Sequence, residues 1–149
     1  MTQAKQKQAF TIIRTNWLAS ENALRSIREQ VFIVEQNVPE ALEWDEYDGD
    51  AIHILVQDGD NKPIATARLL TDGHIGRMAV LSPWRRQGVG TAMLRVLLEY
   101  CREKNMNPYL DAQTHALGFY EKMGFKTMGD EFLDAGIPHR RMISDYGIV

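Results

Sequence analysis

Alternating apolar and polar positions predict short strands in the first half of the chain. Phe10 to Arg14 is a short strand candidate, and two longer apolar runs, Ala51 to Gln57 and Ile64 to Leu70, flank the polar segment Asp58-Gly59-Asp60-Asn61. Two apolar runs joined by a short turn of this composition are typical of an antiparallel hairpin. The first half therefore predicts a strand, followed later by an antiparallel meander.

Between the first strand and the hairpin, apolar residues three or four positions apart predict a helix. Ser20 is a suitable N-cap, and Leu24, Ile27 and Val31 fall on one face of a helix that runs towards Gln36. The run Val31 to Val34 also fits a strand, but we interpret it as helix. A loop is expected from Asn37 to Asp50, and it carries a dense acidic set: Glu40, Glu43, Asp45, Glu46, Asp48 and Asp50.

The central part of the chain predicts a strand, a glycine-containing loop and a long helix. Ile75 to Leu81 is the strand, and Ser82-Pro83 ends it because proline lacks the N–H that a sheet ladder needs. The helix has an apolar stripe formed by Val89, Met93, Val96, Leu97, Tyr100 and Cys101. Tyr109 to Gln113 is the next strand. A strand, a helix and a strand in this order imply one parallel pair inside an otherwise antiparallel sheet.

The last part of the chain predicts a short helix and two strands. The helix runs from His115 to Lys122, with Thr114 as its cap and Gly124 just after its end. The strands are expected at Phe125 to Phe132 and at Arg140 to Tyr146. There are no internal repeats or linkers, so we expect residues 1–149 to form one α/β domain with a mixed sheet.

The loop between the central strand and the long helix has the composition of an anion site. Arg85-Arg86-Gln87-Gly88-Val89-Gly90 places two arginines and two glycines where a helix begins. The free N–H groups of a first helical turn and the helix dipole favour a negative ligand, and arginine supplies forked donors. The loop therefore fits a pyrophosphate. It is neither a P-loop, which requires a lysine, nor a dinucleotide fingerprint, since Met93 stands where a third glycine is required.

The pattern Arg85-x-x-Gly88-x-Gly90 after a strand resembles the coenzyme-A signature of the GNAT superfamily of N-acetyltransferases. Leu117 to Phe125, a helix with a Phe-Tyr pair that ends in Gly-Phe, resembles the second recognisable passage of that superfamily. Val34 to Pro39 and Gly136 to His139 further resemble its small ElaA-like branch. The resemblance implies the GNAT acyl-CoA N-acyltransferase fold, in which the fourth and fifth strands splay apart.

The resemblance also implies where acetyl-CoA would bind. The pantetheine arm would pair with backbone groups at the end of the central strand, the N–H of Val80 would act as an oxyanion donor, and the diphosphate would lie on the amides from Gln87 to Thr91. The coenzyme-binding residues implied in this way are Met78, Ala79, Val80, Arg85, Arg86, Gln87, Gly88, Val89, Gly90, Thr91, Thr114, Phe119 and Tyr120. Acetyl transfer of this kind needs no metal.

Tyr120 is the side chain that we expect to act as a general acid, because a hydroxyl beside the thioester sulfur can protonate the departing thiolate. From the residues alone, packing on a short helix is the alternative. The base that removes the amine proton is left open among Glu43, Asp111 and His139. The alternatives are a solvated loop carboxylate for Glu43, a strand-end cap for Asp111 and, for His139, a turn histidine that stabilises its own loop. Cys101 lies on the inner stripe of the long helix, which favours burial and direct transfer over a cysteine-linked intermediate.

Composition limits the partners. The net charge of -3 gives no general attraction to nucleic acid or to an anionic membrane. The single cysteine cannot form an internal disulfide, and there is neither a long apolar run nor a signal-peptide core, so we expect a cytoplasmic protein.

The sequence thus predicts an N-acetyltransferase that moves an acetyl group from acetyl-CoA to a primary amine of a small molecule or peptide. The transfer would occur by direct attack in a ternary complex. A different class stays open: a non-catalytic module that senses coenzyme A or a nucleotide. The acceptor and the oligomeric state, with a homodimer among the alternatives, cannot be read from the residues.

Overall fold

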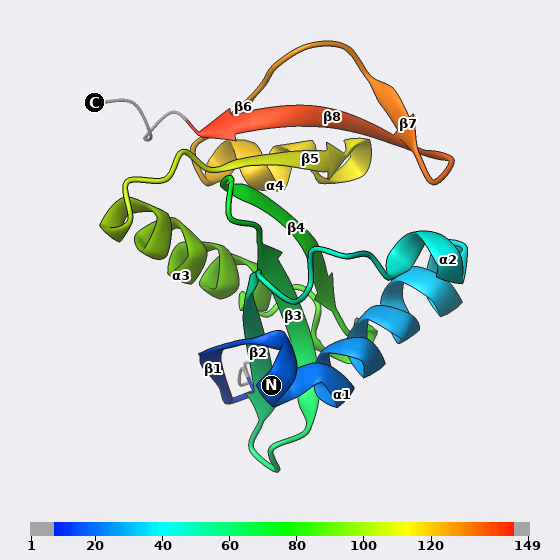
Figure 1. Ribbon diagram of the computed structural model, residues 1–149, viewed down its shortest axis with the longest axis vertical. Coiled ribbons are helices and arrows are strands. Elements are labelled where there is room, and N and C mark those ends of the chain that lie inside the picture. The colour runs from blue at the N-terminus through cyan, green and yellow to red at the C-terminus, as the bar shows by residue number, and fades with distance from the viewer. Residues whose placement is uncertain (1–7, 145–149) are drawn as a thin grey trace, which may run out of the picture.

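The computed structural model describes residues 8–144, and an eight-stranded mixed sheet runs through it (Figure 1). Its strands are β1 (Phe10–Thr15), β2 (Ile52–Asp58), β3 (Pro63–Leu69), β4 (His74–Val80), β5 (Tyr109–Gln113), β6 (Phe125–Thr127), β7 (Phe132–Asp134) and β8 (Ile137–Ser144). The spatial order is β1-β2-β3-β4-β5-β8-β6, and β7 pairs with β8 beside this path. The α/β class and the hairpin of β2 and β3 are confirmed.

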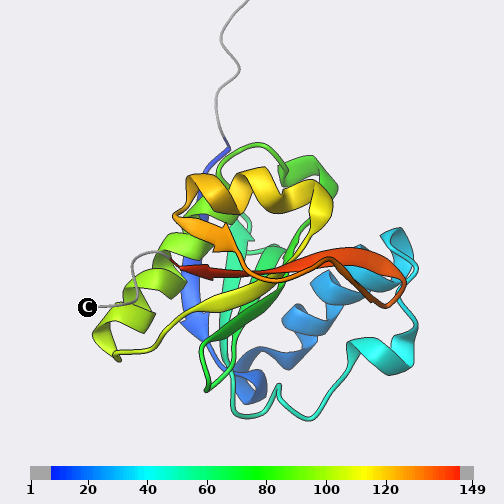
Figure 2. The same cartoon turned by 90° about the horizontal axis from the view of Figure 1, so that it is seen from above.

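Helices cover both faces of the sheet. They are α1 (Trp17–Arg28), the π-helix η1 (Glu29–Glu35), α2 (Glu40–Glu43), the 3-10 helix η2 (Ser82–Trp84), α3 (Val89–Glu103), the 3-10 helix η3 (Thr114–Ala116) and α4 (Leu117–Lys122). Seen from above, α1 and α3 lie on opposite sides of the strands (Figure 2). In residues 8–144, no helix combines the length and the apolar character needed to span a membrane.

Two apolar clusters form the core, one on each face of the sheet. The cluster under α3 contains the inner side of that helix, including Met93, Leu97 and Cys101, packed on strand residues such as Ile54 and Leu110. The cluster under α1 is smaller and contains the stripe that the sequence predicted, Leu24, Ile27 and Val31, together with residues of β2 and β4. Burial of both stripes fixes the two helices on the sheet.

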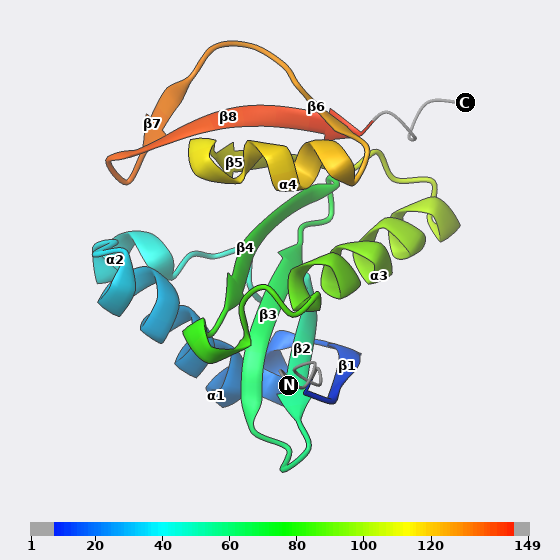
Figure 3. The same ribbon diagram turned by 180° about the vertical axis from the view of Figure 1, so that it is seen from behind.

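The sheet opens between β4 and β5. Within residues 8–144 these parallel strands pair only at His74–Tyr109 and Ile75–Leu110, although β4 continues to Val80 and β5 to Gln113. Figures 1 and 3 show β5 and β8 lying across one end of the molecule while β4 runs away from them. The splayed central strands that the resemblance implied are therefore present.

A β-bulge lies in β4 next to this opening. Thr66 of β3 pairs with Ala79, but Arg68 pairs with Gly76, so β4 contains one residue more than its partner over this stretch. Arg77 lies in the bulge and has a positive φ of 46°. A bulge bends the strand and increases its local twist, which turns the end of β4 away from β5.

The first helix begins before the predicted cap. Asn16 is the N-cap of α1 and its side chain accepts a hydrogen bond from the Ala19 N–H at 2.8 Å, whereas Ser20 lies at a kink inside the helix with non-helical backbone angles. The helical interpretation of Val31 to Val34 is correct, although the helix there is a π-helix. The expected loop from Asn37 to Asp50 contains the short helix α2.

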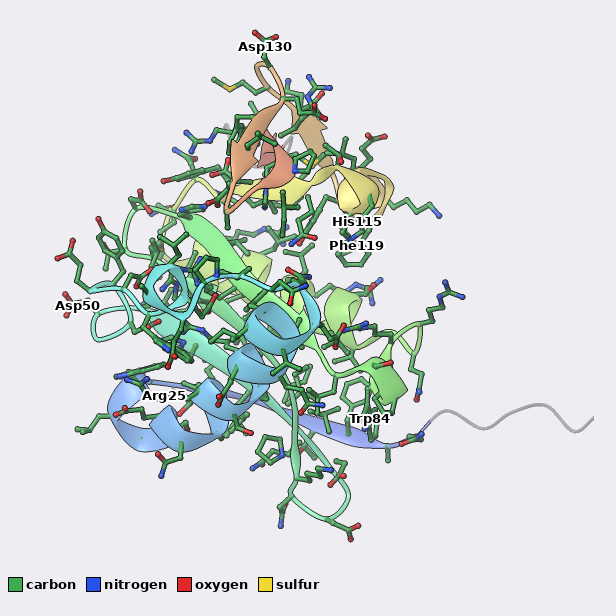
Figure 4. All side chains as sticks on the ribbon, turned by 90° about the vertical axis from the view of Figure 1, so that its right-hand side faces the viewer. Arg25, Asp50, Trp84, His115, Phe119 and Asp130 are labelled. Carbon is green, nitrogen blue, oxygen red and sulfur yellow. The ribbon has the colours of Figure 1, made fainter. Side chains whose placement is uncertain are left out.

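The C-terminal part differs most from the prediction. The strand expected at Phe125 to Phe132 is wrong, because β6 ends at Thr127 and β7 begins at Phe132, with Gly129 between them at a positive φ of 83°. Figure 4 shows Asp130 at the outer tip of this connection. β8 begins at Ile137, ahead of the predicted start, and the predicted end at Tyr146 lies outside the described residues.

Candidate active site

The turn between η2 and α3 exposes backbone donors. The first hydrogen bond of α3 runs from the Ala92 N–H to the Gly88 carbonyl at 3.0 Å, so the N–H groups up to Thr91 have no acceptor within the helix. Gly88 has a left-handed φ of 84°, and a Cβ on it would meet nothing within 4 Å. The helix therefore begins at the glycines, as predicted, and the space beside Gly88 is open for a ligand.

The two arginines of this turn have different surroundings. Arg85 Nη2 donates to both carboxylate oxygens of Glu35, at 2.7 and 2.8 Å, and its Nε donates to the Val80 carbonyl at 2.9 Å. Arg86 is exposed and has a positive φ of 63°. The sequence did not predict the contact between Arg85 and Glu35. Because of this contact, the positive charge of Arg85 is already partly neutralised by the protein.

The backbone of Val80 faces the opening of the sheet. The next residue, Leu81, donates its N–H to the Ile64 carbonyl of β3 at 2.9 Å. Backbone groups of successive strand residues point in opposite directions, so the N–H of Val80 points away from β3 and towards the gap beside β5. Met78, Ala79 and Val80, which were expected to meet the pantetheine arm, belong to the part of β4 that does not pair with β5, and of the three only Met78 lines the cavity described below.

Helix α4 places two aromatic rings against this region. A Cβ on Gly90 would lie 3.5 Å from the ring of Phe119, and Figure 4 shows Phe119 projecting from α4. The Tyr120 hydroxyl lies 3.6 Å from the Met78 sulfur on β4. Burial raises the pKa of Tyr120 to about 12, so its hydroxyl keeps its proton at neutral pH. Thr114 was expected to cap this helix, but it lies in η3 and no side chain caps α4.

A cavity of about 380 Å³ lies in the gap between β4 and β5. It brings together Tyr120, Met78 and all three candidate bases, Glu43, Asp111 and His139, although these residues come from five separate elements. The chain segments that line it include the end of η1, α2, the bulge of β4, and β5, η3, α4 and β8. A cavity of this size can hold a small organic group next to Tyr120.

Glu43 is part of a network of three arginines and three carboxylates, of which Arg77 and Asp45 are partly exposed and the others are buried. Its Oε2 accepts a hydrogen bond from Arg28 Nε at 2.8 Å and lies 3.1 Å from Arg77 Nε. Arg28 also pairs with Asp48 at 2.7 Å, and Arg68 pairs with Asp45 at 2.8 Å and with Asp48 at 3.0 Å. Burial raises the pKa of Glu43, while Arg77 and Arg28 oppose that shift. The network fastens the acidic segment after α2 to the sheet.

Asp111 is also paired. Arg141 on the neighbouring strand donates to its two oxygens at 2.9 and 3.2 Å, and His74 Nε2 lies 3.6 Å from Oδ2. Burial lowers the pKa of His74, which Asp111 opposes. His74 lines the cavity and was missed by the sequence reasoning, because it stands at the start of β4 with no neighbouring motif.

His139 lies on β8, opposite Gln113 of β5, and not in a turn. The residue is 8% exposed, and its ring stacks on Phe132 with 5.9 Å between ring centroids and places Nδ1 2.6 Å from the Ile137 carbonyl. Cys101 is buried in the core, away from the cavity, and burial raises the pKa of its thiol to about 11. Among residues 8–144, no group of three or more His, Cys, Asp or Glu side chains could hold a metal ion.

The fold is that of the acyl-CoA N-acyltransferases. A model of the acetyltransferase (GNAT) domain matches residues 5–145, and the chain belongs to this family. Members of the family transfer acyl groups from acyl-CoA.

Similar proteins indicate which members of the family this chain most resembles in sequence and in structure. The chain is 40% identical over 124 residues to YjcF of Bacillus subtilis, an uncharacterized N-acetyltransferase, covering 80% of this chain and 88% of that one. It is 35% identical over 126 residues to the protein ElaA of Escherichia coli, covering 78% and 82%. The crystal structure of Escherichia coli ElaA superposes with a TM-score of 0.82 and 30% identity over 92% of this chain and 100% of that one. An acyl-CoA N-acyltransferase from Pseudomonas aeruginosa superposes with a TM-score of 0.82 and 29% identity, covering 91% and 99%.

Proposed function

We propose that this protein transfers the acetyl group of acetyl-CoA to a primary amine of a small molecule or peptide, by direct attack in a ternary complex. The observation that carries the proposal is the cavity in the gap between β4 and β5, since it places an acceptor-sized space next to Tyr120 and Met78. A module that only sensed coenzyme A would need the glycine turn but not this second space.

Residues on one side of the gap would hold the thioester. The amides from Gln87 to Thr91 would bind the diphosphate, with the exposed Arg86 beside them, and Phe119 would pack near the first turn of α3. The Val80 N–H would donate to the developing oxyanion, a contribution that is typically ~3 kcal/mol in acyl transfer. Acetyl-CoA supplies the activated thioester on which these groups act.

Tyr120 would complete the transfer as general acid. Its pKa of about 12 means that the hydroxyl is protonated when the amine attacks, so it has a proton to give to the sulfur as the carbon–sulfur bond breaks. The side chains of the acceptor side, Glu43, Asp111 and His139, are candidates for the group that takes the amine proton.

The test is a panel of primary amines incubated with acetyl-CoA, reading free thiol with a thiol-reactive dye. Thiol release that depends on both an amine and the folded protein is expected, with the acetylated amine identified by mass spectrometry. A thermal shift with coenzyme A gives the matched binding measurement, because a ligand at a hundred times its Kd adds ~2.7 kcal/mol to the free energy of unfolding. Stabilisation by coenzyme A without thiol release for any amine would favour the sensor instead.

A further inference from the structure

The three candidate bases that the sequence named, Glu43, Asp111 and His139, differ in how their lone pairs are engaged. Glu43 is 2% exposed and lies between the guanidinium groups of Arg28 and Arg77. Protonation of Glu43 would remove the charge that compensates these two arginines, even though burial raises its pKa. Asp111 accepts two hydrogen bonds from Arg141. The oxygens of both carboxylates are therefore already engaged by arginine side chains. Arginine keeps its proton in proteins, so these ion pairs persist and make each carboxylate a poorer proton acceptor.

His139 differs because its hydrogen bond leaves a free lone pair. Nδ1 lies 2.6 Å from the Ile137 carbonyl oxygen, and a carbonyl oxygen can only accept, so the hydrogen is on Nδ1. In the neutral ring the lone pair is then on Nε2. Stacking on Phe132 and burial of the ring hold this orientation. The imidazole is thus held in one orientation, with Nδ1 hydrogen-bonded and Nε2 able to accept a proton.

The position of His139 in the sheet directs it to the acceptor side of the gap. It pairs with Gln113 on β5, and paired residues of antiparallel strands project from the same face. Asp111, two residues before Gln113, shares that face and also lines the cavity. Met78 and Tyr120 line the cavity from β4 and α4. The cavity therefore has a hydroxyl donor on one wall and an imidazole acceptor on another.

We propose that Nε2 of His139 is the general base that accepts protons from the acceptor amine, directly or through one water; this rests on the proposed function. An ammonium loses two protons when it becomes an amide. His139 takes them one at a time and passes them to solvent, the amine nitrogen bonds to the carbonyl carbon, and the carbon–sulfur bond breaks. Tyr120 gives one proton to the sulfur and regains one from solvent, so one proton is released per turnover.

The main test compares wild type with His139→Asn and His139→Ala, using the amine and acetyl-CoA pair that gives the highest thiol release. His139→Asn keeps a donor for the Ile137 carbonyl but removes the basic nitrogen, which separates base from scaffold. We expect kcat to fall by about 10²-fold or more in both variants, because general-base catalysis typically contributes that much. The Kd for coenzyme A should stay the same.

Added imidazole should restore part of the activity of His139→Ala but none of that of Tyr120→Phe, since only the first lacks a base. A purely structural role would not be rescued in this way. Thermal unfolding of each variant reports whether it is folded. If His139→Asn retains the wild-type kcat, or if imidazole leaves His139→Ala unchanged, the assignment of the base is overturned and the transferase activity stands.

Nitrogen-15 spectra of the wild-type imidazole rings give a second test that needs no acceptor and no variant activity. The Nδ1 of His139 should carry the proton in the neutral ring, and Nε2 should show the shift of an unprotonated nitrogen. A proton found on Nε2 overturns the proposal. A wild type that releases thiol with no amine overturns the proposed function, and the role of His139 with it.

Discussion

Arg85 forms an ion pair with Glu35, in which Arg85 Nη2 donates to both carboxylate oxygens, at 2.7 and 2.8 Å. The contact joins the end of η1 to the turn before α3, and the same guanidinium also holds the Val80 carbonyl at 2.9 Å. The residue that the sequence assigned to the diphosphate is thus already engaged by an exposed carboxylate. A diphosphate at the glycine turn has to compete with Glu35 for this charge.

Replacing Glu35 by Gln should therefore strengthen coenzyme-A binding. Exposed ion pairs typically contribute 0.2–1 kcal/mol, so we expect a Kd lower by up to about fivefold at low salt, with the gain shrinking as salt is added. Isothermal titration calorimetry with coenzyme A measures it. Glu29→Gln, an exposed glutamate on the same π-helix, is the matched control and should leave the Kd unchanged. An unaltered or weaker affinity in Glu35→Gln would contradict the competition.

Gly88→Ala should reduce both stability and coenzyme-A binding. Its φ of 84° is left-handed, and an L side chain in that region costs ~1–2 kcal/mol. The added methyl group would also fill the open space beside the first turn of α3. Urea unfolding and calorimetry give the two values. Gly59→Ala, in the turn between β2 and β3, also meets nothing within 4 Å but has no such backbone angle, so it should be near neutral. Equal losses in both variants would argue against the conformational explanation.

Tyr120→Phe should lower kcat by about 10²-fold or more and leave the Kd for coenzyme A within about twofold of wild type, because only the hydroxyl is removed. Steady-state kinetics with the best acceptor measures the effect. Tyr100→Phe on α3, which removes a hydroxyl outside the cavity, should retain the wild-type kcat. A wild-type kcat in Tyr120→Phe would remove the assigned role.

The pH dependence of Tyr120 follows from its raised pKa of about 12, compared with ~10 in an unfolded chain. A raised tyrosine pKa means that the folded state holds the proton more tightly. Its contribution to stability is therefore complete below pH ~10 and is lost as pH rises towards about 12. The difference in tyrosinate absorbance between wild type and Tyr120→Phe should show no ionisation of Tyr120 below pH 10. Ionisation near pH 8 would be incompatible with this environment.

Arg28→Met should be strongly destabilising, since Glu43 and Asp48 are both buried and each would lose one of the two arginines that it contacts. Removal of one partner from a buried ion pair typically costs 3–5 kcal/mol. Urea unfolding measures the loss. Arg95→Met, at an exposed position of α3, should change the free energy of unfolding by no more than ~0.5 kcal/mol. A similar small change in Arg28→Met would mean that the network contributes little to the fold.

The sequence predicted the features that depend on neighbouring residues. The parallel pair around α3, the hairpin at Asp58–Asn61 and the glycine turn at Gly88 each follow from local spacing or turn chemistry, and all are present. The break between β6 and β7 was missed because apolar residues at both ends of Phe125 to Phe132 suggested one continuous strand. In the structure, Gly129 interrupts this segment with a positive φ.

The buried ion pairs could not be predicted in the same way. Arg28, Glu43 and Arg68 are far apart in the sequence, and their partnership depends on how α1, α2 and β3 meet. A hint was available: Arg28 ends an otherwise apolar helical face, and Arg68 interrupts an apolar strand. Charged residues at such positions are rarely buried unless paired. The hydrogen bond that sets the proton of His139 likewise needs the geometry of β8.

The gap between β4 and β5 also has a consequence for folding. Because only two residue pairs join these strands within residues 8–144, nearly all ladder hydrogen bonds of this part of the chain lie within β1–β4 or within β5–β8. Each group consists of consecutive segments, so its pairing can form before the other group is in place, even though β1 pairs with residues of β2 as far away as Asp58. The last event is then the docking of two preassembled units through α3, and a pantetheine arm laid along β4 would occupy the place of the missing rungs.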